Sequence, residues 1–428
     1  MTFSGSRRLV GLGFGAIQSG LFVYEAFRTN DYAPPLVVDV RPDLVAGLRA
    51  DRGHFRVNIA RRDRVDVAQI GPTDVADSTI EDERELVVEA IASADELASA
   101  LPSVAFYRTD GANSPHRLLA QGLRRRARPQ PLVVFCAENH RSAAQMLEAA
   151  VLEAVPTDER DAIRTRARYV DTVIGKMSGV ISDDAELRQH SLATIASGLR
   201  SAFLVEEFDR ILVSRVGGGL HPGMPVLREV DDLAPFEDAK LLGHNATHAL
   251  AGFLGELLGL GLVADLRDVP GAMDFLRTAF IEESGGTLRR RWTGADELFT
   301  EEGYATFADD LLARMVNPWL ADTVERAGRD PRRKLGWEDR LVGLVRMGLA
   351  LGVPTPRYAM GVAAGLEILR RDGEMGSDSE LLRSCWPDGV PGDEAGAVVT
   401  AAEQGRAWLE AWSADGFASL AQRGTASA

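Results

Sequence analysis

Cysteine, positive charge and long apolar runs are all scarce in this sequence, and each shortage excludes a class of protein. Its 428 residues include two cysteines, Cys136 and Cys385, too few for a disulfide framework, which favours a reducing cytoplasm. No uninterrupted apolar stretch reaches the ~18 residues that a membrane-spanning helix needs. The 48 Lys and Arg residues face 63 Asp and Glu residues, for a net charge of −15. We therefore expect neither nucleic acid nor an anionic membrane as a partner.

The composition that is present is typical of a folded protein with more than one domain. Hydrophobic residues make up 45% of the chain and charged residues 26%, which excludes disordered and collagen-like proteins. A single core rarely grows beyond about 250–300 residues, so this length predicts at least two domains.

Short strands and helices alternate in the first part of the sequence. We expect strands at residues 8–12, 36–40 and 131–136, an apolar run at 86–91, and helices at 19–28, 42–51, 95–101 and 117–126. The expected strands are nearly continuous apolar runs, as is usual for strands buried on both faces. This alternation predicts an α/β fold with a Rossmann-like, doubly wound parallel sheet.

The pattern changes near residue 235. Apolar residues then recur at helical spacing, with few strand candidates, in segments at 237–262, 273–283, 304–315, 337–351, 357–371 and 397–412. We therefore predict an NAD-binding Rossmann-like domain over residues 1–235 and a mostly α-helical C-terminal domain over residues 236–428. Residues 419–428 are small and polar, and we expect them to fray.

The first residues of the chain have two interpretations. Arg7 and Arg8 precede an apolar stretch, which superficially resembles a twin-arginine export signal. Gln18, Ser19 and Glu25 interrupt that stretch, and no clear small-residue cleavage site follows it. We therefore favour a strand, a glycine turn and a helix, and a cytoplasmic location.

The segment from residue 13 to residue 20 has the composition of a dinucleotide-binding turn. Such a turn uses glycines for a tight bend, for close approach of the pyrophosphate and for helix packing, while the helix N-terminus supplies N–H donors. Gly13 and Gly15 fit the first two roles, Gln18 occupies the third place, and Gly20 follows it. These are the candidate cofactor-binding residues. The alternative is a structural turn that binds nothing.

Asp39 supports the cofactor interpretation. It ends the second expected strand, 19 residues after Gly20. A carboxylate at that place accepts hydrogen bonds from the adenosine ribose and repels a 2′-phosphate, which favours NAD over NADP. Arg41 lies two residues further on and works against this preference.

A second group of polar residues lies in a strongly apolar segment. At 100° per residue, with Lys240 at 0°, His244 lies at about 40°, His248 near 80° and Asn245 near 140°. Most large apolar neighbours fall between about 180° and 320°. A lysine, an amide and two imidazoles on one face of a buried helix are typical of a proton-transfer site.

Two other interpretations of this face remain open. His244 and His248 have the spacing of a zinc-binding helix, but Asn245 stands where the general-base Glu of a His-Glu-x-x-His hydrolase belongs. The same side chains would also serve as hydrogen-bonded core residues without a chemical role.

Proton transfer here needs no metal ion. Desolvation and nearby positive charge lower the pKa of a lysine from its usual value near ~10.4. The neutral amine of Lys240 then takes the proton of a carbinol as its hydride leaves to nicotinamide. Asn245 and His248 would donate hydrogen bonds to the oxygen as negative charge develops on it.

The spacing of Lys240, Asn245 and His248 resembles the signature of the polyol-specific long-chain dehydrogenases, the mannitol dehydrogenase family: Lys, four residues, Asn, two residues, His. Residues 135–139 are similar to a Cys-Glu-Asn strand end of that family, and residues 317–341 resemble its mannitol-1-phosphate 5-dehydrogenase branch. The resemblance covers most of the chain. It implies that Lys240 is the general base, that Asn245 and His248 orient the substrate oxygen, and that Asn139 adds a second amide.

The resemblance also implies the substrate class. The family oxidises a secondary alcohol of an open-chain polyol reversibly and without metal, and the branch implies a mannitol 1-phosphate-like substrate and a fructose 6-phosphate-like product. A phosphate needs basic partners, for which Arg333, Lys334 and Arg340 are the candidates. These side chains would equally serve as solvated or ion-paired charges. The alternative substrates are an unphosphorylated polyol or a sugar acid. The alternative kinds of protein are an inactive nucleotide-binding homologue and a zinc hydrolase, which Asn245 disfavours. The oligomeric state stays open.

Overall fold

The computed structural model describes residues 3–207, 210–417 and 420. The chain divides into two compact units, Met1–Leu233 and Ala234–Ala428, and each is described by itself. The predicted fraying of residues 419–428 lies outside the described residues, apart from Leu420.

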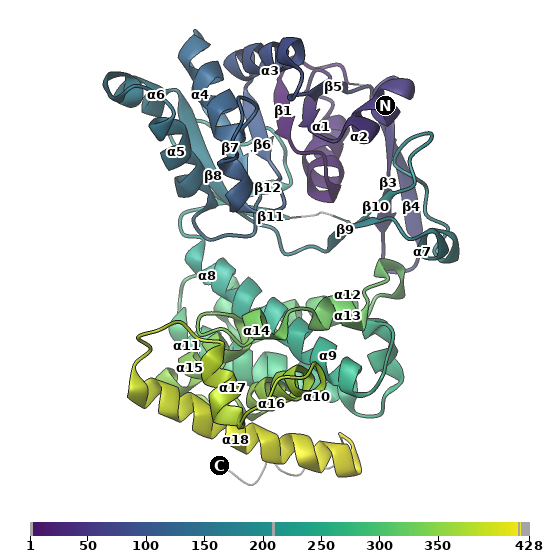
Figure 1. The fold of residues 1–428 in the computed structure, drawn as a ribbon, viewed down its shortest axis with the longest axis vertical. Helices are drawn as coiled ribbons and strands as arrows, with labels where there is room; N and C mark the ends of the chain where they lie inside the picture. The colour runs from purple at the N-terminus through teal and green to yellow at the C-terminus, as the bar shows by residue number, and fades with distance from the viewer. Residues whose placement is uncertain (1–2, 208–209, 418–419, 421–428) are drawn as a thin grey trace. The chain divides into compact units, whose positions relative to one another are not determined.

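An eight-stranded sheet forms the centre of the first unit (Figure 1). Its strand order is β12-β11-β8-β7-β6-β1-β2-β5, and the six strands from β8 to β5 are parallel. The strands are β1 (Leu9–Leu12), β2 (Leu36–Asp39), β5 (Asp74–Asp77), β6 (Glu96–Ser99), β7 (Leu132–Cys136), β8 (Ala167–Val173), β11 (Ile211–Ser214) and β12 (Leu227–Val230). The prediction of a Rossmann-like parallel sheet is confirmed.

The strand order reverses at β1. In register, Leu12 of β1 lies opposite Val38 of β2 on one side and Ser99 of β6 on the other. The chain runs from β1 towards β2 and later from β6 towards β7, in opposite directions across the sheet. Ligands of open α/β sheets bind at the carboxyl ends of the strands beside such a reversal.

Alternate residues of the central strands face two different cores. In β7, Val133 and Phe135 join one hydrophobic cluster while Val134 and Cys136 join the other. The second cluster contains apolar residues of α3 (Glu81–Ser93), α4 (Pro115–Arg125) and α5 (Ala143–Glu153). The first contains those of η1 (Gln18–Val23), α1 (Tyr24–Thr29), α2 (Pro42–Ala50) and a second sheet. The central strands are therefore apolar on both faces.

The second sheet, of four strands, was not predicted. Its order is β4-β3-β10-β9, with β3 (Phe55–Ala60), β4 (Val65–Ile70), β9 (Ser178–Ile181) and β10 (Ala202–Glu206). Only β3 and β4 form a local hairpin, since β10 joins β3 from far along the chain. Short further elements of this unit are η2 (Val104–Tyr107), η3 (Thr157–Glu159), α6 (Arg160–Thr165) and α7 (Asp184–Gln189).

The helix expected at residues 95–101 is wrong, because this segment contains the buried strand β6. Glu96 and its alanine neighbours suggested a helix, but the Glu96 carboxylate is buried and accepts hydrogen bonds from Tyr32 and from the backbone N–H of Gly223. Tertiary partners thus override local helix propensity here. The apolar run at 86–91 lies within α3.

The helix after the glycine turn also begins earlier than expected. The chain is helical from Ala16, and its residues Gln18–Val23 form a π-helical segment. Gln18 and Gly20, which we placed in the turn, therefore lie inside the helix and are fully buried. The helix ends as predicted at Asn30, which has left-handed backbone angles.

The second unit is helical, as predicted. In order, its elements are α8 (Ala234–Asp238), η4 (Ala239–Asn245), α9 (Ala246–Leu257), η5 (Val263–Asp268), α10 (Ala272–Thr278), η6 (Ala279–Ser284), α11 (Gly285–Arg291), η7 (Glu297–Phe299), α12 (Glu301–Met315), η8 (Pro318–Leu320), α13 (Val324–Gly328), α14 (Pro331–Lys334), α15 (Arg340–Leu351), α16 (Pro356–Arg371), α17 (Asp378–Ser384) and α18 (Gly392–Asp415). The first predicted helix ends at Leu257 and not at residue 262, because Gly259 turns the chain with a φ of +70°.

Helices α9 and α16 lie in the interior of the second unit. Both are buried along most of their length, and α9 packs against α13, α15 and α16, while α18 lies along α16 (Figure 1). Within the described residues, no helix is both long and apolar enough to cross a membrane.

Candidate functional site

The glycine turn of the first unit is held by a buried aromatic ring. Gly13 has a φ of +80°, and a Cβ atom there would lie 3.0 Å from the carbonyl oxygen of Ala100, so only glycine fits. Phe14 is fully buried and packs edge-on against Phe55 and Phe203. The turn therefore lies at the carboxyl ends of β1 and β6, where the strand order reverses.

The helix that follows leaves open space and an unused polar group beside the turn. A Cβ atom on Gly15 would meet no atom within 4 Å, so a ligand can approach the backbone closely. Gln18 is fully buried, and its amide has no hydrogen-bond partner within the described part of the chain. Such an amide is unfavourable by about 1–3 kcal/mol unless a water or ligand satisfies it. Gly20 lies deeper and permits close packing, since a Cβ there would come within 2.6 Å of Val205.

Asp39 connects the end of β2 to this turn. One carboxylate oxygen accepts hydrogen bonds from the backbone N–H and Nε of Arg41, each at 2.9 Å. The other accepts from the backbone N–H of Phe14 at 2.8 Å and from Nη2 of Arg41 at 2.9 Å. These donors hold the pKa of Asp39 below its usual value against the opposing effect of burial. The predicted contact of Asp39 with a ribose stays a prediction.

These features fit a dinucleotide. The bend at Gly13, the open backbone at Gly15 and the unsatisfied Gln18 amide lie together at the start of a helix, where N–H donors attract a pyrophosphate. The structure thus brings the predicted cofactor-binding residues of the turn together with Asp39.

In the second unit, a π-helical segment carries the predicted base. Lys240 and Asn245 both lie in η4, and His248 follows in the first turn of α9. In an α-helix, residues five apart differ by about 140° in direction. A π-helix bonds residue i to residue i+5, which brings such residues onto one side. The structure therefore places Lys240 and Asn245 closer in direction than the sequence predicted.

Two carbonyl groups of this π-helical segment accept hydrogen bonds from side-chain hydroxyl groups. Ser284 Oγ donates to the carbonyl oxygen of Leu242 at 3.0 Å, and Thr247 Oγ1 donates to that of Gly243 at 2.9 Å. Because buried carbonyl groups need hydrogen-bond partners, these contacts stabilise the irregular helix. Thr247 is in turn within 2.6 Å of the hydroxyl of Tyr358. The π-helical geometry is thus built into the core of the unit.

The environment of Lys240 makes it a base near neutral pH. Burial, together with the positive charge of Arg340, lowers the pKa of Lys240 to about 8, while Glu237 acts in the opposite direction. An ordinary lysine has a pKa near ~10.4, so this amine is neutral far more often at physiological pH. Such a shift is typical of a catalytic amine.

The four side chains of the predicted helix face differ in burial. Lys240, Asn245 and His248 are each partly buried, whereas His244 is buried. Burial, with the positive charge of Arg314 nearby, lowers the pKa of His244 well below its usual value, so the ring is neutral. The prediction that all four side chains share one helix face stays a prediction.

His244 also belonged to the zinc alternative. The ring centroids of His244 and His248 lie 6.3 Å apart. Among the residues that the structure describes, no three or more His, Cys, Asp or Glu side chains are grouped to hold a metal ion.

His248 is hydrogen-bonded to a buried carboxylate. Its Nε2 lies 2.5 Å from Oδ2 of Asp322, and Nη1 of Arg326 donates to Oδ1 of the same group at 2.9 Å. Asp322 can come this close because α13 packs directly on α9 at Gly252, where a Cβ atom would lie 2.6 Å from the backbone of Ala327. The glycine thus permits the approach that orients the imidazole.

Asn139 belongs to the first unit, where it follows β7 and is exposed. The preceding Glu138 is buried and accepts hydrogen bonds from Ser99 Oγ at 2.6 Å, from the backbone N–H of Leu101 at 2.9 Å and from the hydroxyl of Tyr107. Burial raises the pKa of Glu138. Glu138 therefore fixes the loop after β6, and the predicted role of Asn139 stays a prediction.

The three predicted phosphate ligands differ in environment. Arg333 is exposed and donates to Asp330 at 3.1 Å. Lys334 is buried, donates to the carbonyl oxygen of Arg329, and has a pKa lowered to about 8 by burial and by Arg340. Arg340 is buried and donates to Asp339 at 2.7 Å. The charge of Arg340 thus lowers the pKa of both Lys240 and Lys334. Arg333, in contrast, forms an ion pair with Asp330 at the surface.

Comparison with protein-family models gives two matches that together span most of the sequence. The model of the mannitol dehydrogenase Rossmann domain matches residues 7–213, and that of the mannitol dehydrogenase C-terminal domain matches residues 232–413. The chain belongs to the mannitol dehydrogenase family. The family resemblance drawn from the spacing of Lys240, Asn245 and His248 is confirmed at this level.

Solved structures of similar fold include two polyol dehydrogenases. A D-sorbitol dehydrogenase in substrate-free form is 16% identical, with a TM-score of 0.75, over 96% of this chain and 94% of that one. The Pseudomonas fluorescens mannitol 2-dehydrogenase, in a ternary complex with NAD and D-mannitol, is 17% identical, with a TM-score of 0.69, over 99% of this chain and 95% of that one. At these identities the likeness establishes the fold. The resemblance to the mannitol-1-phosphate 5-dehydrogenase branch stays a prediction.

Asp322 and Glu138 are the residues of interest that sequence reasoning missed as partners. Asp322 contacts His248 although 74 residues separate the two in the chain. Glu138 binds Ser99, Leu101 and Tyr107, which lie 31 to 39 residues before it. The sequence offers no local signal for either contact.

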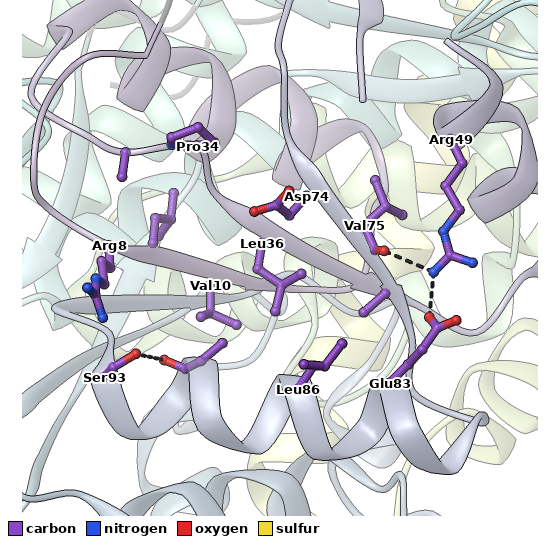
Figure 2. Close-up of a pocket in the computed structure, with 14 residues that line it drawn as sticks. Arg8, Val10, Pro34, Leu36, Arg49, Asp74, Val75, Glu83, Leu86 and Ser93 are labelled. Atoms are coloured by element: carbon purple, nitrogen blue, oxygen red, sulfur yellow. Dashed lines mark hydrogen bonds and ion pairs between the residues drawn. The ribbon is translucent and has the colours of Figure 1, made fainter. Parts of the chain in front are cut away.

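A groove of about 650 Å³ in the first unit is separate from the glycine turn. It lies between α3 and the amino ends of β1, β2 and β5, where Arg8, Leu36 and Asp74 line it (Figure 2). Gly13 and Asp39 follow the opposite, carboxyl ends of β1 and β2. At the groove edge, Arg49 donates to the carbonyl oxygen of Val75 and pairs with Glu83 (Figure 2).

Proposed function

We propose that this protein is an NAD-dependent oxidoreductase that interconverts a secondary alcohol of an open-chain polyol and the corresponding ketone. The observation that carries the proposal is the Lys240 amine, whose pKa is lowered to about 8, in the same π-helical segment as Asn245 and close in sequence to His248. Membership of the mannitol dehydrogenase family supports the same reaction class.

The residues of the turn would hold the cofactor. Gly13 and Gly15 present the backbone to the pyrophosphate, and Gln18 supplies an amide that needs a partner. NAD, when bound, supplies the acceptor for the hydride that leaves the carbinol carbon.

The residues of the second unit handle the proton and the charge. The neutral Lys240 amine accepts the proton of the substrate hydroxyl, and in the reverse direction its ammonium returns that proton. Asn245 donates a hydrogen bond to the oxygen as negative charge grows. His248 donates through Nε2 to Asp322, so its Nδ1 is left as an acceptor for the hydrogen of a substrate hydroxyl. Asn139 is proposed as a second amide donor.

For the substrate we propose a sugar-alcohol phosphate, mannitol 1-phosphate-like, with the free polyol as the second candidate. The support is the positive charge of the buried Arg340, which lowers the pKa of both Lys240 and Lys334. Asp339 is the carboxylate that Arg340 contacts. A phosphate would add the missing negative charge. The exposed Arg333 contributes least to this argument.

A substrate panel tests both parts of the proposal. Initial rates of nicotinamide reduction are measured with NAD and with paired free and phosphorylated polyols. We expect turnover of polyols, a lower KM for the phosphorylated member of a pair, and loss of that advantage in Arg340→Gln. Equal KM values for the two members of each pair would favour the free polyol as substrate. Binding of NAD without turnover of any polyol would indicate an inactive nucleotide-binding homologue.

A further inference from the structure

The Asp39 carboxylate has no acceptor capacity left for a ribose. An ionised carboxylate offers about four lone-pair sites. In this structure four donors occupy them: the backbone N–H groups of Phe14 and Arg41, and Nε and Nη2 of Arg41, at 2.8–2.9 Å. A ribose hydroxyl could bind Asp39 only by displacing one of these donors. Asp39 therefore acts first as the anchor of Arg41 and of the glycine turn.

Arg41, in contrast, has donors to spare. Its Nη2 also donates to the carbonyl oxygen of Phe14 at 2.9 Å, which fixes the guanidinium plane against the turn. Among the described residues, the two N–H groups of Nη1 have no partner, and the side chain is 49% exposed. At the end of β2, beside a glycine turn, this is the place of the adenosine ribose in a dinucleotide-binding fold.

We propose that Arg41, and not Asp39, faces the adenosine ribose, and that the protein consequently accepts NADP as well as NAD. This inference rests on the proposed function. The two free N–H groups of Nη1 can each donate to a phosphate oxygen, and Arg41 is held in place by Asp39 and Phe14 before the ligand arrives. Since Arg41 neutralises Asp39, a 2′-phosphate meets no bare carboxylate at this residue.

Two other carboxylates keep NAD competitive. Asp43 lies in the first turn of α2, and its charge contributes to the raised pKa of Arg41. Asp77 of β5 lies opposite Asp39 in the register of the sheet. Their negative charge opposes that of a 2′-phosphate. The expectation is therefore acceptance of both coenzymes, and not a preference for NADP.

Equilibrium binding tests this without turnover. The Kd values of NADH and NADPH are measured by nicotinamide fluorescence, and 2′-AMP and 5′-AMP are compared by calorimetry. Because Arg41 attracts a 2′-phosphate while Asp43 and Asp77 oppose it, we expect NADPH to bind wild-type protein within about tenfold of NADH. In Arg41→Ala, the loss of the cation and the exposure of Asp39 should together weaken NADPH relative to NADH by at least about tenfold.

Arg49→Ala is the matched control, because Arg49 lies at the other end of α2, is 45% exposed and is also ion-paired (Figure 2). It should leave the NADPH-to-NADH ratio unchanged, whereas Arg41→Lys should keep part of the NADPH affinity. The inference is overturned if wild type binds NADPH more than about tenfold more weakly than NADH, or if Arg41→Ala and Arg49→Ala give the same ratio. If wild type binds neither coenzyme, the proposed function falls too, which separates the two failures.

Discussion

His248 and Asp322 form a hydrogen-bonded pair, with 2.5 Å between Nε2 and Oδ2, although 74 residues separate them in the chain. Asp322 is 3% exposed, and Arg326 binds its other oxygen. An ionised carboxylate only accepts, so the proton of the imidazole lies on Nε2 and Nδ1 faces away from Asp322.

Asp322→Asn should lower kcat by at least about tenfold with little change in KM, because the amide no longer fixes the tautomer and orientation of the imidazole. The readouts are kcat, KM and the pH profile of kcat. Glu325→Gln makes the same chemical change at an exposed position three residues further on, and it should have no effect. A normal kcat in Asp322→Asn would show that this pair has no catalytic consequence.

Lys240→Ala should abolish turnover and leave the Kd of NAD within a few-fold of wild type. Lys240→Arg should be equally inactive, because a guanidinium keeps the charge but does not give up its proton. Small primary amines added to Lys240→Ala should restore part of the rate if the missing group is a base. Measurable wild-type turnover in Lys240→Arg would contradict the assignment.

The rate of alcohol oxidation should rise with pH and level off above about pH 8. The neutral amine is the active form, and its pKa is lowered to about 8 by burial and by Arg340. Below that pH, kcat should fall about tenfold per unit as Lys240 becomes protonated. Arg340→Gln removes a positive charge, which raises the pKa of Lys240 and should move this acidic limb of the pH profile of kcat to higher pH. A limb that stays in place would exclude Arg340 as a cause of the low pKa.

Gly252→Ala should destabilise the protein by about 1–3 kcal/mol and lower kcat as well. A Cβ atom there would lie 2.6 Å from the backbone of Ala327, so α13 must move and carry Asp322 away from His248. Gly396→Ala in α18 is the matched control, since a Cβ there meets nothing within 4 Å. Its better helix propensity should stabilise by about 0.5–1 kcal/mol. Chemical denaturation and steady-state kinetics measure both variants, and equal stability of the two would refute the packing argument.

Local patterns in the sequence determined the class of fold and the positions of the main functional elements. Apolar runs predicted β1, β2 and β7, and helical spacing predicted the second unit, because these signals lie within a few residues of one another. The same holds for the glycine turn and for the spacing of Lys240, Asn245 and His248. Each of these sequence signals depends on local backbone preferences or on the spacing of residues along one helix.

Tertiary contacts decided the rest. The strand β6 replaced an expected helix because Glu96 finds buried partners far along the chain. The second sheet, the contact of His248 with Asp322, and the low pKa of Lys240 beside Arg340 likewise depend on residues distant in sequence. Asp39 and Arg41 are two residues apart, yet both also bind the backbone of Phe14, which lies 25 residues before Asp39. Burial and partner charge set the chemistry of a side chain, and folding alone brings such partners together.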